Sequence, residues 1–182
     1  PKPGDERLAG ANYKLVATPA RSLEAAAARA RIAGYEPVML GDAIEGEARD
    51  VARGHARRAL ETPGPAVLIS GGETTVTHDG GGRGGRNAEY LLSLALALDG
   101  APGVWAIACD TDGIDGSEDN AGALMTPDSY ARAEALGLSA ADELANNNGY
   151  GYFQALDALL MTGPTRTNVN DFRAILILPQ SR

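Results

Sequence analysis

Hydrophobic and polar positions divide the chain into short apolar runs separated by longer segments of mixed character. Each apolar run is bounded by Gly, Pro or polar residues, which is typical of buried β-strands. These predicted strands cover residues 14–18, 36–40, 66–70, 104–109 and 173–178, and residues 74–76 are a candidate for one more. The segments between them predict helices at residues 19–33, 46–60, 87–98, 127–136, 139–144 and 152–160. This alternation predicts an α/β domain of three layers, with a largely parallel or mixed sheet and helices on both faces.

Two of the predicted helices carry specific end or burial signals. Thr18 is a suitable N-cap, Pro19 fits the first helical position, and Gly34 stands just past the helix end. The segment 87–98, NAEYLLSLALAL, is apolar almost all the way round, so we expect a helix that is buried on most of its surface. Its N-terminus adjoins a glycine-rich segment.

Composition limits the class of protein. The 182 residues, 44% of them hydrophobic, are enough for one globular domain with a substantial core. The formal net charge of -8 argues against a nucleic-acid groove, and no long apolar stretch or signal-peptide pattern indicates a membrane or an exported protein. The single cysteine, Cys109, excludes a disulfide within the chain and a cysteine cluster for zinc, which favours the cytoplasm.

The first residues predict a connector that precedes the fold. They read Pro-Lys-Pro-Gly and include no initiator methionine. We therefore expect residues 1–11 to be a flexible connector, residues 12–182 to form one α/β domain, and an upstream N-terminal domain to be missing from this chain.

A glycine-rich segment with two arginines, residues 78–90, is the first candidate for chemistry. Its glycines expose backbone N–H groups, and Arg86 and Asn87 stand at the start of the predicted buried helix, where an anion is favoured. Arg86 also offers a bidentate contact to carboxylate or phosphate. The alternative is a surface hairpin whose Asn87 only caps the helix. The GxGxxG match of the glycines is weak evidence for a dinucleotide, and a P-loop is excluded because no lysine lies near them.

Two further polar segments are candidates for the same site. Asp110, Asp112 and Asp115 follow an apolar strand, and such carboxylates suit Mg²⁺ or a base that acts on a hydroxyl. Asx turns are the alternative explanation. Asn168 offers an amide to a polar ligand, although turn hydrogen bonds explain its segment equally well. Because ligands of open α/β sheets bind outside the carboxyl ends of strands, we expect these segments to meet at one edge.

Other polar residues are expected to be structural. His55 and His78 lack the partners that a metal or nucleophile site requires. Residues 146–148, three asparagines, predict a helix end and a turn.

Five ordered motifs resemble one known family. They are SGGETTV from Ser70, GRGGRNAEY from Gly82, DTDGIDG from Asp110, NAG at Asn120 and TGPTRTNVNDFRAIL from Thr162. In this order and spacing they resemble the MOFRL-type C-terminal region of the class II glycerate kinases, some of which are labelled hydroxypyruvate reductases. The matching core covers residues 66–178. The resemblance implies a two-domain kinase that transfers phosphate from ATP to the 2-hydroxyl of D-glycerate with Mg²⁺, in a cleft between an N-terminal domain and this one.

The resemblance also implies a set of site residues. Arg86 matches the arginine of the family's GGRN signature and is the first candidate for binding glycerate carboxylate or transferred phosphoryl charge. Chemistry adds roles for its neighbours: catalytic Arg86, Asp112 and Asp115; substrate-binding Glu73, Thr74, Arg83, Asn87 and Asn168; and metal-binding Asp110 and Asp112. ATP and Mg²⁺ are expected to act through the full-length protein, with neither bound tightly to this chain alone. The expected partners are glycerate and the missing N-terminal domain, a homodimer is allowed, and neither nucleic acid nor membrane is expected.

Two departures and two alternatives qualify the resemblance. Ala88 stands where the family commonly has Gln, and residues 147–150 replace an Asn-Asp-Ser-Tyr-like run and so lose an acid and a hydroxyl. The alternatives are an NAD(P)H-dependent hydroxypyruvate reductase and a non-catalytic domain that binds a ligand or regulates a partner domain.

Overall fold

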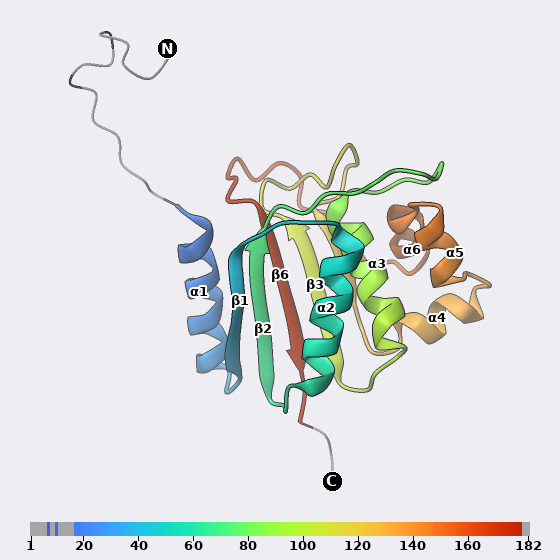
Figure 1. Cartoon of the computed structure of the whole chain (residues 1–182), viewed down its shortest axis with the longest axis horizontal. Coiled ribbons are helices and arrows are strands. Elements are labelled where there is room, and N and C mark those ends of the chain that lie inside the picture. Colours follow the sequence, from blue (N-terminus) through green and yellow to red (C-terminus); the bar gives the residue numbers. More distant parts are fainter. Residues whose placement is uncertain (1–6, 8–9, 11–16, 180–182) are drawn as a thin grey trace.

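The computed structural model describes residues 7, 10 and 17–179, which form a six-stranded sheet with helices packed against it (Figure 1). The sheet order is β1-β2-β6-β3-β4-β5. The strands are β1 Glu36–Ile44, β2 Ala66–Gly72, β3 Val104–Asp110, β4 Gly122–Met125, β5 Leu159–Leu160 and β6 Asp171–Ile177. The predicted α/β class is confirmed, with a mixed sheet.

Strand directions correct the expectation of a largely parallel sheet. Only β1 and β2 pair in parallel, whereas β6 lies between β2 and β3 and is antiparallel to both. Strands β4 and β5 extend the sheet with further antiparallel pairs. The apolar runs predict strands but carry no direction, and β6 enters the sheet from the edge at which β2 and β3 end. That edge, at the top of Figure 1, therefore brings together the ends of β1, β2 and β3 with the starts of β4 and β6.

Helices lie on both faces of the sheet, as predicted, although in the described part of the chain one face carries a single helix, packed against β1 and β2. They are α1 Pro19–Ile32, α2 Ala48–Glu61, α3 Arg86–Leu98, α4 Ser129–Ala135, α5 Ala140–Ala145 and α6 Gly149–Ala155. Successive residues of β2 face opposite sides, so Ile69 packs with Leu23 of α1 while Leu68 joins the larger cluster with α2 and α3.

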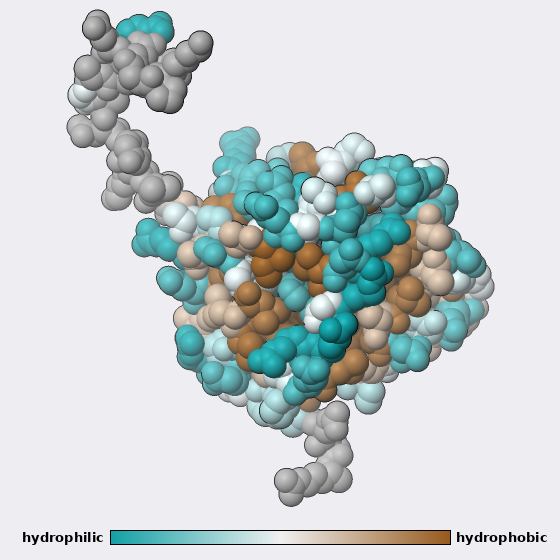
Figure 2. Space-filling view, in the orientation of Figure 1, coloured by the Kyte–Doolittle hydropathy of each residue, from teal (hydrophilic) through white to brown (hydrophobic). Residues whose placement is uncertain are grey.

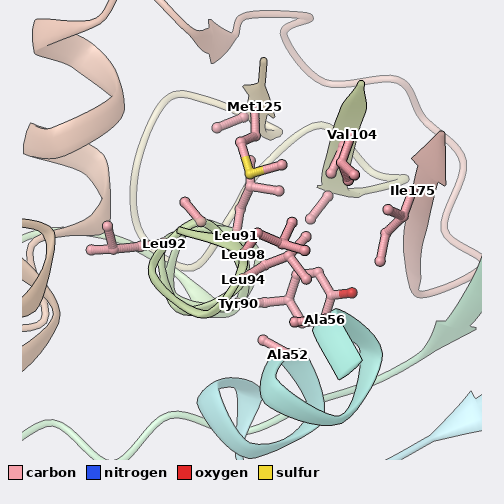
Figure 3. Close-up of a cluster of buried hydrophobic side chains, with 14 of the residues drawn as sticks. Ala52, Ala56, Tyr90, Leu91, Leu92, Leu94, Leu98, Val104, Met125 and Ile175 are labelled. Atoms are coloured by element: carbon pink, nitrogen blue, oxygen red, sulfur yellow. The ribbon is translucent and has the colours of Figure 1, made fainter. Parts of the chain in front are cut away.

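Helix α3 is the centre of the larger cluster. Its buried residues include Tyr90, Leu91, Leu92 and Leu94, none of which is accessible to solvent, and this confirms the helix expected from the all-round apolar pattern. Figure 3 shows side chains of α3 filling the space between α2 and the strands β3 and β6, with Tyr90 close to the alanines of α2 and Leu92 on the other side of α3, pointing away from the strands. Because so much apolar surface is buried around it, α3 is held rigidly against the sheet edge.

Several element ends agree with the sequence, and some do not. The Thr18 hydroxyl accepts from the Arg21 N–H at 3.2 Å and Pro19 opens α1, as predicted. Residues 74–76 form only an isolated bridge between Thr75 and Glu47, so no extra strand follows β2. The helix expected over residues 152–160 begins at Gly149 and ends at Ala155, and β5 follows it. Strand β4 was not predicted.

Two predictions concern residues that the structure does not describe. The expected connector, residues 1–11, lies outside the described residues apart from residues 7 and 10, and so do residues 14–16 of the first predicted strand. Residues 17 and 18, at the end of that predicted strand, are not in a strand.

The surface is polar along α2 and apolar beside it. In Figure 2 hydrophilic side chains cross the front face diagonally along α2, with hydrophobic residues on both sides. On the face of the sheet opposite α2 and α3, Trp105 and Leu124, on neighbouring strands, are 42% and 43% exposed. Within the described part of the chain, no helix is long and apolar enough to cross a membrane.

His55 of α2 gives the fold a predicted pH dependence. Its Nδ1 lies 2.8 Å from the Tyr90 hydroxyl, and burial, aided by the charge of Arg173, lowers the pKa of His55 to about 4. The unfolded chain, with an ordinary histidine pKa of about 6.5, takes up this proton first, so the contribution to stability is complete above about pH 6.5 and is lost as the pH falls towards 4. We therefore expect urea unfolding to show a smaller loss of stability between pH 7 and 4.5 in His55→Gln than in the wild type.

The matched control is His78→Gln, since His78 is exposed. It should follow the wild-type pH profile. Parallel profiles of the wild type and His55→Gln would contradict the burial of a neutral His55.

Candidate functional site

The register of the central strands places two aspartates side by side on neighbouring strands. Asp110, the last residue of β3, pairs with Asp171, the first residue of β6, which also pairs with Gly72 at the end of β2. Both aspartates are on the face that packs against α3, and they are 4% and 1% exposed. Two buried like charges this close require a cation between them.

Arg86, the first residue of α3, provides that cation. Its Nε donates to Asp171 Oδ1 at 2.8 Å, its Nη2 donates to Asp110 Oδ2, and its Nη1 lies 3.8 Å from Glu73 Oε1. Burial alone would lower the pKa of Arg86, but Asp171 and Asp110 outweigh it and raise the pKa. Burial raises the pKa of Asp110 to about 6, against the effects of the Asp112 N–H and Arg86. Arg86 therefore contacts the acidic segment at Asp110, as the sequence predicted.

A second arginine, fully buried and not considered from the sequence, completes the cluster. Arg173 is 1% exposed, and its Nη2 donates to Asp171 Oδ2 and, at 3.1 Å, to the Thr74 hydroxyl. Its guanidinium also lies 5.2 Å from the centre of the Tyr90 ring. An available signal was the alternation in DFRAILI, because residues 171 and 173 have the same parity as the buried isoleucines at 175 and 177.

The N-terminus of α3 is occupied by the protein itself. Asp115 accepts from the backbone N–H groups of Asn87 and Ala88 at 2.9 Å each, and the Asn87 side chain donates to Asp115 at 3.2 Å. Asp115 has no exposed surface. Burial raises its pKa, against the hydrogen bonds from Asn87 and Ala88. The helix end that was expected to attract a ligand anion thus already holds a carboxylate.

Most of the glycine-rich segment lies against the three asparagines that follow α5. Asn147 Oδ1 accepts from the N–H groups of Asp79 and Gly80 at 3.1 and 2.9 Å, and neighbouring asparagines accept from residues 81–83. A Cβ on Gly80 would lie 2.3 Å from the Asn146 carbonyl oxygen. These glycines therefore admit another part of the chain, and the asparagines, expected only to form a turn, hold the segment in place.

The remaining glycines border a cleft of about 290 Å³. Residues 82–86 line one side and residues 116–118 the other, with Thr74, Val76 and His78 completing the wall. Within the described part of the chain, the N–H groups of Gly84 and Gly85 make no hydrogen bond. Arg83 is paired with Glu118, Nη2 to Oε2 at 2.5 Å. Among the described residues, the donors at this cleft that make no hydrogen bond therefore include two glycine N–H groups and Nη1 of Arg86.

The other expected site residues lie at the same edge with different partners. Asp110 and Asp112 both make Asx turns, accepting from the N–H groups of Asp112 and Ile114 at 3.0 and 2.9 Å. Asn168 donates to the second oxygen of Asp112 at 3.3 Å, and the Glu73 side chain is 62% exposed. Among the residues that the structure describes, no three His, Cys, Asp or Glu side chains form a metal-binding group.

The MOFRL family model matches residues 66–171, from the first residue of β2 to Asp171, and so includes most of the site. The chain belongs to the MOFRL family. A protein of Agrobacterium vitis, provisionally named a hydroxypyruvate reductase, is 52% identical, with 91% of this chain covering 46% of that protein. A D-glycerate 2-kinase of Thermotoga maritima is 35% identical, with 95% of this chain covering 43% of the kinase.

Solved structures agree with this assignment of the MOFRL chain. The crystal structure of a glycerate kinase from Thermotoga maritima superposes with a TM-score of 0.88 at 36% identity, over 92% of this chain and 42% of that one. A Pyrococcus horikoshii structure gives the same TM-score at 33% identity, over 93% and 40%. The chain therefore spans less than half the length of these relatives.

The cap that Asp115 places on α3 predicts a large stability effect. Asp115→Ala leaves two buried N–H groups without an acceptor, so we expect a loss of about 2–4 kcal/mol in the free energy of unfolding, measured with urea. Asp115→Asn, which retains one oxygen, should lose less. The control Asp50→Ala removes an exposed ion-paired carboxylate and should change stability by no more than about 0.5 kcal/mol. A loss of that small size in Asp115→Ala would show that the cap does not hold α3.

Proposed function

We propose that this chain supplies half of a site at which the full-length protein phosphorylates D-glycerate with ATP. The observation that carries the proposal is the position of Arg86. Its Nη1 edge borders one cleft together with the N–H groups of Gly84 and Gly85, which make no hydrogen bond to the residues that the structure describes. The similarity to glycerate kinases from Thermotoga maritima and other organisms supports the substrate. Fixed donors of this kind stabilise the negative charge that develops on a carboxylate or a transferring phosphoryl group.

The contacts divide the candidate residues by role. Arg86 is the proposed catalytic residue, and Asp112 is the proposed base towards the 2-hydroxyl, because it lies nearer to solvent than Asp110 or Asp115. Glu73, Arg83 and Asn168 are exposed and remain candidates for substrate binding. Thr74, Asn87 and Asp115 are buried, so we assign them to holding the site together.

The nucleotide and its metal are assigned mainly to the part of the relatives that lies outside this chain. Asp110 already binds Arg86 and the Asp112 N–H, and in the described residues no three His, Cys, Asp or Glu side chains are placed to hold a metal, so we assign no Mg²⁺ site made of protein ligands alone to this part of the chain. A Mg²⁺ ion bound largely by phosphates and water needs only one or two carboxylates, for which Asp112 is the accessible candidate. Its contribution would be to neutralise phosphate charge.

The names of the Agrobacterium vitis relatives favour a second candidate, reduction of hydroxypyruvate with a nicotinamide cofactor. A dinucleotide fold places the pyrophosphate at a helix N-terminus behind a glycine loop. In this chain Asp115 occupies that helix end, and the N–H groups of residues 79–83 are bonded to the asparagines. These contacts support the kinase over the reductase.

Arg86→Lys in the full-length protein tests the proposal. Lysine retains the charge between Asp110 and Asp171 but cannot reproduce the guanidinium contacts, so we expect kcat/KM for glycerate-dependent ADP formation to fall by about 100-fold or more with little change in Tm. Alanine is a poorer choice, because two buried carboxylates left unpaired cost about 3–5 kcal/mol.

The control Arg53→Lys, on the exposed face of α2, should leave turnover unchanged. Hydroxypyruvate with NADH is assayed in parallel. Near-normal ADP formation by Arg86→Lys, or NADH oxidation that depends on hydroxypyruvate, would refute the proposal.

A further inference from the structure

We infer that Asp171 and Arg173 of β6 form a positioning pair that orients and electrically balances Arg86 for its role at the cleft. This inference rests on the proposed function, since it concerns how Arg86 is prepared for an anionic substrate. Neither residue is a catalytic residue, because their side chains are 0% and 1% exposed and cannot touch a substrate.

Asp171 joins three separate elements through one carboxylate. Oδ1 accepts from Arg86 Nε at 2.8 Å and from Asn87 Nδ2 at 2.9 Å, both of α3. Oδ2 accepts from Arg173 Nη2 of its own strand and from the Thr74 N–H at 3.4 Å, in the segment after β2. A side chain with four donors from α3, β6 and this segment has little freedom to rotate.

This arrangement fixes which edge of Arg86 remains available. With Nε bound to Asp171 and Nη2 bound to Asp110, the plane of the guanidinium is set, and Nη1 is left without a hydrogen bond, 3.8 Å from Glu73. The open edge is therefore in place before a substrate arrives. Contacts prepared in this way lower the reorganisation required at the moment of reaction.

Arg173 accounts for the charge of the cluster. Asp110 and Asp171 together carry two negative charges, so Arg86 alone would leave the group negative and repel an anion. Arg173, paired with Asp171, brings these four side chains to neutrality, so the negative charge nearest to Nη1 is that of the exposed Glu73. Its contacts with the Thr74 hydroxyl and the Tyr90 ring hold it inside the domain, so its contribution reaches the cleft only through Asp171 and Arg86.

Stability alone does not explain a buried ion pair at this place. The next two residues of β6 that face α3 are Ile175 and Ile177. Replacing a buried ion pair by apolar residues of similar size often costs no stability. The pair lies only at the end of the strand that contacts Arg86. Its placement thus follows the site and not the core.

A double-mutant cycle in the full-length protein separates positioning from a merely structural role. Asp171→Asn, Arg86→Lys and the double variant are compared by kcat and KM for glycerate-dependent ADP formation, at a temperature where each is folded. We expect Asp171→Asn alone to lower kcat/KM by about 10-fold to 100-fold, mainly through kcat. When Arg86 is already replaced by lysine, adding Asp171→Asn should lower kcat/KM by less than about threefold. Lysine has no Nε–H for Asp171 to orient, so little further effect is expected.

Two further variants control for loss of stability and for failure of Asp171→Asn to fold. Leu94→Ala, in the core away from the site, controls for destabilisation and should lower Tm without changing kcat/KM at that temperature. If Asp171→Asn does not fold, Asp171→Glu keeps the charge, displaces the acceptors by one carbon–carbon bond and should show the same coupling with Arg86→Lys.

The outcomes are distinguishable. Losses that multiply independently, or an Asp171→Asn enzyme within twofold of the wild type, would overturn the positioning role and leave the proposed function standing. An Arg86→Lys enzyme with normal turnover would overturn the proposed function and this inference together.

Discussion

The pairing of Asp110 with Asp171 across β3 and β6 is the constraint on which the site depends. Sheet register places these buried carboxylates opposite one another, and their mutual repulsion requires a cation at one defined place. Arg86 is that cation, and it fixes where α3 begins. The segments before and after α3 must therefore reach the same sheet edge.

Helix α3 links this charged edge to the stability of the whole domain. Its N-terminus is held by Asp115, and its length is buried among α2, α4, α5, α6 and the sheet. The glycine-rich segment that leads into it is held by the amides of residues 146–148. Because α3 is fixed in the core, Arg86 at its first position is held in place before a ligand binds. A preorganised site requires side chains that are held by rigid elements in this way.

The sequence predicted those parts of the fold that depend on local pattern. The α1 cap at Thr18 and the buried α3 follow from residue types at fixed spacing, and the meeting of Arg86 with Asp110 followed from the expectation that the candidate segments share one edge. The direction of β6 was not predictable, because an apolar run reads the same either way. The partner of the glycines was also hidden, since the three asparagines lie more than sixty residues further along the chain. Arg173 was not identified, because the sequence does not show that β6 lies between β2 and β3, which is what places Asp171 and Arg173 beside Asp110 and Thr74.

The central claim is that Gly84, Gly85 and Arg86 form the part of the cleft that receives negative charge. Hydrogen exchange of the full-length protein, with and without D-glycerate and a non-hydrolysable ATP analogue, tests it most directly. The account predicts that exchange at Gly84 and Gly85, whose N–H groups have no acceptor among the described residues, slows by about tenfold or more with ligands. Exchange at Gly80 and Gly81, already bonded to asparagines, should change little. Unchanged exchange at Gly84 and Gly85 in the presence of saturating ligands would contradict the account.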